Sequence, residues 1–256
     1  MPATEVAKKD VSPRRLQWLT AMVSDVIDET PRTRTLMLDV PAWPGHRAGQ
    51  HLDVRLTGDD GYQAQRSYSI ASAPEAPHLA ITVERIEDGE VSPYLAGDVQ
   101  KGDKFELRGP IGGYFVWEAG DERPLLLIAG GSGIVPLMAM LRHRESAGSK
   151  TPARLLYSSR TAEDIIYKAE LERLSAGDPD LKVAHTLTRG HPPGWAGYTR
   201  RIDREMVRDV AWPPEQNPSV FICGPTSFVE TAAGLLVDAG HVPASIKTER
   251  FGATGG

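Results

Sequence analysis

Residues 125–136 read LLLIAGGSGIVP, an uncharged segment in which an apolar run enters a glycine-rich turn. A buried strand followed by such a turn directs the free N–H groups of the next helix toward a phosphate. The glycines and Pro136 interrupt the apolar run before it reaches the roughly 20 residues that a membrane span needs. We predict a strand, a turn and a helix at a dinucleotide site. Because Pro136 replaces the usual third glycine, glycines that merely allow a tight turn are the alternative.

The chain downstream of this segment alternates between two periodicities. Strands are predicted near residues 125–129, 154–158, 181–187, 220–223 and 245–249, and helices near 136–146, 167–175, 204–210 and 228–239. Strands that alternate with helices form right-handed crossover units around a parallel sheet. Residues 119–256 are therefore predicted to be a doubly wound α/β domain.

The upstream half has the pattern of an all-β domain. Short alternating runs, separated by Gly, Pro and Asp clusters, lie at residues 22–27, 35–40, 51–56 and 78–86. This pattern predicts an antiparallel Greek-key β-barrel over residues 16–118. A single helical turn is expected at residues 92–96, with Ser92 as its N-cap and Pro93 at its first position.

Composition restricts the class of protein. The 256 residues are 40% hydrophobic and 25% charged, with a net charge of −5, so we expect a globular protein without nucleic-acid or membrane partners. The single cysteine excludes a disulfide framework and a cluster held by four cysteines of this chain, and no metal site is expected. Residues 1–15 carry four basic side chains but no signal-peptide core, which predicts a flexible leader and a cytoplasmic setting.

The end of the second predicted α/β strand indicates which nucleotide binds. Ser159 and Arg160 stand where a ribose 2′-phosphate would lie, and Arg189 follows the next strand. This favours NADPH, with NADH also possible, and two later arginines, Arg200 and Arg201, could join the cluster. The alternative is that Arg160 pairs with a surface carboxylate, Glu163 or Asp164.

Several short motifs occur in a fixed order along the chain. They are RSYS at 66–69, GPIGGYF at 109–115, GSGIVP at 131–136, CGP at 223–225 and ERFG at 249–252. In this order, over about residues 16–251, the chain resembles the ferredoxin–NADP reductase superfamily. The resemblance implies that the barrel binds a flavin and that the α/β domain binds a pyridine nucleotide. Residues 109–115 would be the turn that closes the barrel, or turn chemistry alone.

The first motif supplies the implied flavin contacts. Arg66 would fork onto the flavin phosphate, within the strand that also carries Ser67. Tyr68 would pack on the isoalloxazine ring, and Ser69 would hydrogen-bond near N5, where hydride arrives.

A second segment, residues 83–95, resembles the other flavin motif of the family. It contributes the implied contacts Val83, Gly89, Val91 and Ser92, and its helix would aim N–H groups at a pyrophosphate. This favours FAD over FMN.

The remaining motifs imply the nucleotide contacts and the catalytic residues. Gly131, Ser132, Gly133, Gly224 and Pro225 would contact the nucleotide, with the Cys223 thiol beside the nicotinamide C4. Phe251 would cover the flavin face that the nicotinamide must reach, and Glu249 would relay a proton near N5. Without the resemblance, the alternatives are a buried small apolar cysteine, a core aromatic residue and a solvated carboxylate.

The resemblance implies an NAD(P)H-dependent flavoprotein reductase. Hydride would pass from NADPH to N5 of FAD, and single electrons would then pass to a separate ferredoxin, flavodoxin or oxygenase component, since no cysteine-rich cluster domain is present. Two alternatives remain: a reductase of free flavin, ferric complexes or quinones, and a non-catalytic nucleotide-sensing subunit of electron transfer.

Overall fold

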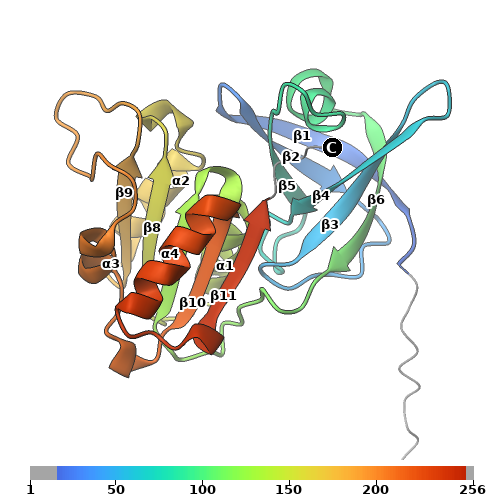
Figure 1. Cartoon of the computed structure of the whole chain (residues 1–256). Coiled ribbons are helices and arrows are strands. Elements are labelled where there is room, and N and C mark those ends of the chain that lie inside the picture. Colours follow the sequence, from blue (N-terminus) through green and yellow to red (C-terminus); the bar gives the residue numbers. More distant parts are fainter. Residues whose placement is uncertain (1–15, 252–256) are drawn as a thin grey trace, which may run out of the picture.

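The computed structural model describes residues 16–251 as two sheet-based halves that lie side by side (Figure 1). The predicted leader, residues 1–15, and Gly252 of the last motif lie outside the described residues. No helix within the described range has the length and apolar character needed to cross a membrane.

The first half is an antiparallel six-stranded barrel. Its strands are β1 (Leu19–Thr30), β2 (Thr33–Asp39), β3 (His51–Thr57), β4 (Gln63–Ser69), β5 (Leu79–Glu84) and β6 (Lys104–Ile111). Their order in the sheet is β4-β3-β6-β1-β2-β5, and a bridge between Ile70 and Ile81 joins the two edges. Side chains that alternate along each strand, such as Leu52 and Val54, fill the interior. The predicted Greek-key barrel is confirmed.

Two local expectations in the barrel are wrong. The helical turn expected at residues 92–96 is present and continues as a π-helix, η1 (Tyr94–Asp98), but Ser92 does not cap it, because its buried hydroxyl accepts the Ile86 N–H at 3.1 Å and closes the preceding loop. Gly109 and Pro110 belong to the end of β6 rather than to a turn. A Cβ at Gly109 would lie 3.0 Å from that of Leu52, so this glycine permits a close strand contact.

The second half is a parallel five-stranded sheet with the order β11-β10-β7-β8-β9. Its elements are β7 (Leu125–Gly130), α1 (Ile134–Ser146), β8 (Ala153–Ser159), α2 (Lys168–Gly177), β9 (Leu181–Leu187), α3 (Arg204–Val210), β10 (Ser219–Pro225), α4 (Thr226–Asp238) and β11 (Ile246–Phe251). The chain leaves β7 toward β8 and returns on its other side at β10. This reversal confirms the doubly wound fold and opens a crevice at the carboxyl ends of the strands.

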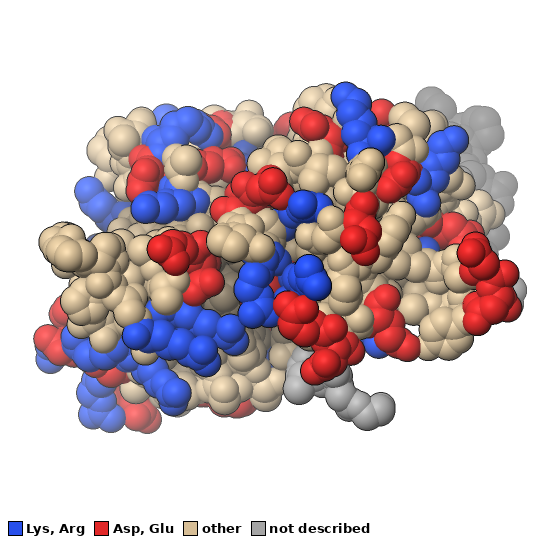
Figure 2. Space-filling view, turned by 90° about the horizontal axis from the view of Figure 1, so that it is seen from above, with Lys and Arg blue, Asp and Glu red and all other residues tan. Residues whose placement is uncertain are grey.

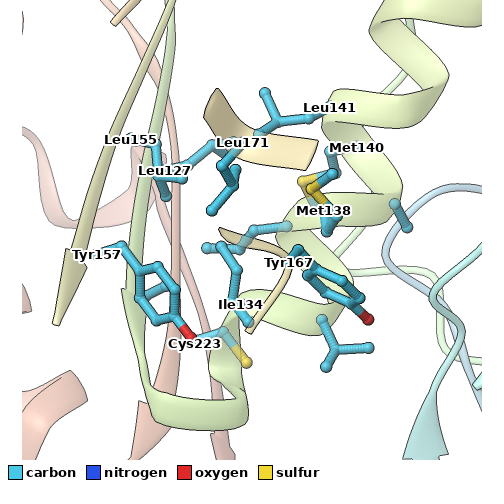
Figure 3. Packing of buried hydrophobic residues seen from close by; sticks show 14 of the residues in the cluster. Leu127, Ile134, Met138, Met140, Leu141, Leu155, Tyr157, Tyr167, Leu171 and Cys223 are labelled. Atoms are coloured by element: carbon cyan, nitrogen blue, oxygen red, sulfur yellow. The ribbon is translucent and has the colours of Figure 1, made fainter. Parts of the chain in front are cut away.

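The central strand β7 is buried on both faces. Leu125 and Leu127 point into the core formed with α1 and α2, whereas Leu126 and Ile128 point into the core formed with α3 and α4. Figure 3 shows the first of these cores, where Leu127 lies among side chains of α1, α2 and β8. Both cores therefore position the turn that follows β7.

A chain of hydrogen bonds crosses from the α/β half into the barrel. The buried Tyr167 hydroxyl donates to Thr82 of β5, whose hydroxyl lies 2.7 Å from that of Thr35 on β2. The Thr35 hydroxyl also donates to Glu29 at 2.7 Å, and burial raises the pKa of that carboxyl. The guanidinium of Arg142 stacks 4.6 Å from the centre of the Tyr167 ring.

Other contacts anchor the remainder of the interface between the halves. The Arg142 guanidinium donates to the Ala71 carbonyl at 2.7 Å, and His143 lies 2.7 Å from a carboxylate oxygen of Glu75. At the opposite end, the Lys247 ammonium donates to the Val116 carbonyl at 3.0 Å. These contacts hold the two sheets in one relative orientation.

Replacing Tyr167 by Phe should lower the free energy of unfolding by about 1 kcal/mol, because it removes one buried hydrogen bond between the halves and keeps the ring. Urea unfolding followed by fluorescence measures the change. Tyr114→Phe is the matched control, since that side chain is 62% exposed and its hydroxyl donates to the Ile246 carbonyl at 3.3 Å. Equal losses in the two variants would contradict the interpretation.

Candidate active site

The glycine turn after β7 forms one wall of the candidate site. A Cβ at Gly133 would lie 2.1 Å from the Cys223 carbonyl oxygen, so only glycine allows the turn to pack against β10. Gly131 has a φ of +55°, in the left-handed region, and open space lies where its side chain would be. The backbone of this turn therefore faces a cavity without obstruction.

A cavity of about 320 Å³, here called the barrel cavity, lies beside β4 and β5. Of the residues predicted to bind flavin, it is lined by Arg66, Ser67, Tyr68, Ser69, Gly89, Val91, Ser92 and Phe251. The prediction that Val83 contacts the flavin is wrong, because its side chain is fully buried in the barrel core. The two motifs, which are distant in sequence, thus meet around one cavity.

The lining of the barrel cavity fits a flavin nucleotide. Arg66 lines this cavity and its guanidinium pairs with Glu90 at 2.6 Å, so a phosphate bound here would take the place of that carboxylate on the guanidinium. The lining atoms are mostly apolar, as a planar ring system requires, and Tyr68 packs there against the barrel core. A Cβ at Gly89 would lie 2.9 Å from the Ser92 hydroxyl, so this glycine keeps the loop compact. Ser67 also lines the cavity, but its hydroxyl is already used, because it donates a hydrogen bond to Asp53 at 2.6 Å.

A second cavity of about 450 Å³, here called the sheet cavity, lies at the carboxyl ends of β7, β8 and β10. It brings together the predicted nucleotide contacts Gly131, Ser132, Ser159, Arg160, Arg189, Pro225 and Phe251. The Ser159 hydroxyl is buried close to the Tyr157 hydroxyl and forms no direct hydrogen bond to another group among residues 16–251. The same cavity is lined by Arg160, Arg189 and the glycine turn, and guanidinium groups beside free backbone N–H groups fit a phosphorylated nucleotide.

The arginines near the sheet cavity differ in their partners. Within the described residues, neither Arg160 nor Arg189 has a carboxylate within 4.0 Å, so the alternative in which Arg160 pairs with Glu163 or Asp164 is wrong. Asp164 instead accepts hydrogen bonds from the N–H and the hydroxyl of Thr161.

The prediction that Arg200 and Arg201 join the arginine cluster at the nucleotide phosphate is also wrong. Arg200 pairs with Asp203 and Glu205 at 2.5 Å each, and neither arginine lines the sheet cavity. Figure 2 looks down on the carboxyl ends of the parallel strands and shows Lys and Arg side chains gathered over the α/β half, on the lower left.

The two cavities meet at three residues. Glu84, Ser132 and Phe251 occur in the lining of both. Phe251 is the last residue of β11 and pairs with Pro225 at the end of β10. A ligand in the barrel cavity and a ligand in the sheet cavity would therefore approach each other at the Phe251 ring.

A buried polar cluster lies beside this meeting point. Cys223 and Glu249 are neighbours in the register of β10 and β11, with the Cys223 Sγ 4.0 Å from a Glu249 oxygen. Burial raises the pKa of Glu249 to about 7, and burial, with the nearby Glu249 carboxylate, raises the pKa of the Cys223 thiol. Neither residue lines the two cavities, and neither do Gly133 and Gly224, which pack the turn against β10.

Sequence reasoning missed one member of this cluster, His51. Its Nδ1 atom lies 3.9 Å from a Glu249 oxygen, and burial lowers its pKa. In the pairing of β3 with β4, His51 stands directly opposite Ser69. Strand register places His51 opposite Ser69, and the packing of the α/β half on the barrel brings His51 beside Glu249, so no motif could have indicated this residue. Within residues 16–251 no group of three or more His, Cys, Asp or Glu side chains is placed to hold a metal ion.

Family models match both halves of the chain. The oxidoreductase FAD-binding domain matches residues 21–116, and the oxidoreductase NAD-binding domain matches residues 127–234. These matches define an oxidoreductase with one flavin domain and one nicotinamide-nucleotide domain, and they confirm the prediction of FAD. The choice between NADPH and NADH stays a prediction.

Relatives narrow the class further. The chain is 38% identical to ferredoxin–NADP reductase B of Sorangium cellulosum over 209 residues, which cover 80% of this chain and 84% of that protein. The chain belongs to the ferredoxin–NADP reductase family. It is also 32% identical to the glycine betaine monooxygenase reductase subunit of Chromohalobacter salexigens over 234 residues, which cover 90% of this chain and 63% of that relative.

Solved structures agree with this fold. The FAD/NAD-binding domain of nitric oxide dioxygenase from Vibrio cholerae superposes with a TM-score of 0.83 at 24% identity, covering 92% of this chain and 99% of that one. The cytochrome P450 reductase of Amycolatopsis superposes with a TM-score of 0.81 at 26% identity, covering 94% of this chain and 71% of that one.

Replacing Glu249 by Gln should change how stability depends on pH. The pKa of Glu249 rises from its ordinary 4.5 in the unfolded chain to about 7 in the fold, so ionisation of this residue disfavours folding. The unfavourable contribution is absent below pH 4.5, grows as the pH rises, and is complete above pH 7. The gain in unfolding free energy from Glu249→Gln should thus increase by about 2 to 3 kcal/mol between pH 5 and pH 8.

Urea unfolding of the two proteins at several pH values measures this difference. The exposed Glu163→Gln variant provides the control and should follow the parent chain throughout. A gain from Glu249→Gln that stays constant across this pH range would contradict the assignment.

Proposed function

We propose that this chain is an NAD(P)H-dependent flavoprotein reductase that takes hydride from NADPH and delivers single electrons to a separate acceptor protein. The observation that carries the proposal is the shared lining of the two cavities at Phe251. A flavin in the barrel cavity and a nicotinamide nucleotide in the sheet cavity would meet there. We also propose residues 16–118 and 119–256 as the flavin and nucleotide domains, and a cytoplasmic setting.

FAD, when bound, supplies a two-electron acceptor at N5 and releases electrons singly. In our proposal the chain's own residues bind and orient it: Arg66 holds the phosphates, Tyr68 packs on the ring and Ser69 donates near N5. Phe251 covers the ring and moves aside so that the nicotinamide can approach. Cys223, buried behind the nicotinamide position, limits the depth to which that ring enters.

Proton movement is assigned to Glu249. A carboxyl with a pKa of about 7 can both accept and release a proton near neutral pH. Burial keeps the Cys223 thiol protonated, so it acts through contact and not as a nucleophile. The nearby His51 lies within the same polar cluster and faces the Glu249 carboxylate.

The acceptor is proposed to be an oxygenase component or a ferredoxin. Support comes from the names of relatives, which include the reductase component of propane 2-monooxygenase from Mycolicibacterium goodii, 32% identical over 232 residues, and the ferredoxin–NADP reductase B above. The described chain covers 64% of the propane 2-monooxygenase relative. Cytochrome c reduction that needs added ferredoxin would support a protein acceptor, and reduction without it would favour a diffusible acceptor.

Replacing Arg66 by Ala should strip FAD from the purified protein, because the variant loses the guanidinium that we assign to the flavin phosphates. The ratio of the flavin absorbance at 450 nm to the protein absorbance at 280 nm measures the FAD retained, and titration of the apoprotein with FAD measures the affinity, which we expect to fall at least about tenfold. Arg85→Ala is a matched control, since Arg85 is also an ion-paired barrel arginine but does not line the cavity. A full complement of FAD in the Arg66 variant would refute the assignment.

NADPH should bleach the flavin faster than NADH in anaerobic stopped-flow experiments, because Ser159, Arg160 and Arg189 offer a phosphate three donors free of carboxylate partners. Arg160→Ala should lower the affinity for NADPH by about tenfold or more and leave the affinity for NADH nearly unchanged. Arg201→Ala, an arginine outside the cavity, is the control. A preference for NADH in the parent protein would reject NADPH as the donor.

A further inference from the structure

Most arginines between residues 16 and 251 lie within 4.0 Å of a carboxylate oxygen. The exceptions are Arg32, Arg154, Arg160, Arg189 and Arg201. Arg154 has another role, because its guanidinium stacks 3.6 Å from the Trp212 ring centre and donates to two carbonyls. Three of the other four, Arg32, Arg160 and Arg189, line the sheet cavity. Positive charge without internal compensation is therefore concentrated at this cavity.

Arg32 differs from the other two because it belongs to the barrel. It lies in the two-residue turn between β1 and β2, and its backbone carbonyl accepts the Arg85 N–H at 2.8 Å. Its guanidinium also donates to the Arg85 carbonyl at 3.0 Å. One guanidinium nitrogen is thus used to fix the side chain, and the remaining N–H groups stay available to a ligand, since a guanidinium has five.

The strand that follows Arg32 pairs with the strand that carries Glu84, which lines both cavities together with Ser132 of the glycine turn. Thr33, the next residue, stands opposite Glu84 in that pairing. Two carboxylates, Glu84 and Asp164, line the sheet cavity as well, but neither lies within 4.0 Å of its arginines, and Asp164 is bonded to Thr161. Arg32 of the barrel therefore lines the same cavity as Arg160 and Arg189 of the α/β half, and none of the three has a carboxylate partner among residues 16–251.

We propose that Arg32 of the barrel domain binds a phosphate group of the nicotinamide nucleotide, so that both domains share the nucleotide site. This inference rests on the proposed function, which places that nucleotide in the sheet cavity. A guanidinium suits the task because its planar fork matches phosphate oxygens and remains charged at every physiological pH. The nucleotide would then link the domains directly, with Arg160 and Arg189 on one side and Arg32 on the other.

The test is equilibrium binding of NADP⁺ and NAD⁺ to the FAD-loaded protein, followed by flavin difference absorbance. Arg32→Ala should lower the affinity for NADP⁺ at least about tenfold, and Arg32→Lys should restore part of that affinity because it keeps the charge. Equal weakening of both nucleotides assigns Arg32 to the pyrophosphate, and weakening of NADP⁺ alone assigns it to the 2′-phosphate. Either result supports the proposal.

Arg34→Ala is the matched control. Arg34 stands two residues away on β2, pairs with Asp28 at 2.8 Å and does not line the sheet cavity, so its loss should leave both affinities unchanged. Dissociation constants of Arg32→Ala within twofold of the parent for both nucleotides would overturn the inference. If the parent protein itself bound neither nucleotide, the proposed function would fail instead, so the two failures are distinguishable.

Discussion

The contact between Tyr167 and the barrel fixes how the two sheets face each other. Tyr167 stands immediately before α2 with a φ of +59°, a left-handed conformation that is costly for a residue with a side chain. In that conformation its buried ring lies under the Arg142 guanidinium and its hydroxyl reaches Thr82. Thr82 in turn lines the barrel cavity. The residue that orients the domains is thus one hydrogen bond away from the flavin-binding surface.

The two cavities depend on that orientation. Each is lined from both halves: the barrel cavity takes Ser132 and Val135 from the α/β half, and the sheet cavity takes Arg32 and Glu84 from the barrel. Neither half alone would enclose its ligand. Backbone packing at Gly133 and hydrogen bonding at Tyr167 therefore act together, because the first places the turn against β10 and the second places the barrel against the turn.

The sequence predicted much of this architecture, because periodicity reports on burial. The strand at residues 181–187 and the helix at 204–210 coincide with β9 and α3. Strand β6 was not predicted, since Gly109 and Pro110 in its final residues have the composition of a turn. The cavity-lining residues that the sequence predicted were found through motifs and at strand ends, whereas His51 and Arg32 carry no local signal. Their positions follow from strand register and from the packing of one domain on the other, which a single sequence does not express.

The two-sided burial of β7 has a consequence for how this chain can change in evolution. Consecutive side chains of the strand enter different cores, so inserting or deleting one residue within it would send each side chain into the opposite core. The side chains would remain buried, but they would no longer fit the packing of either core. The same shift would displace the turn that contacts β10. Length variation is therefore confined to segments such as the loop between β9 and α3, while the strand itself can vary only by substitution with side chains of similar volume.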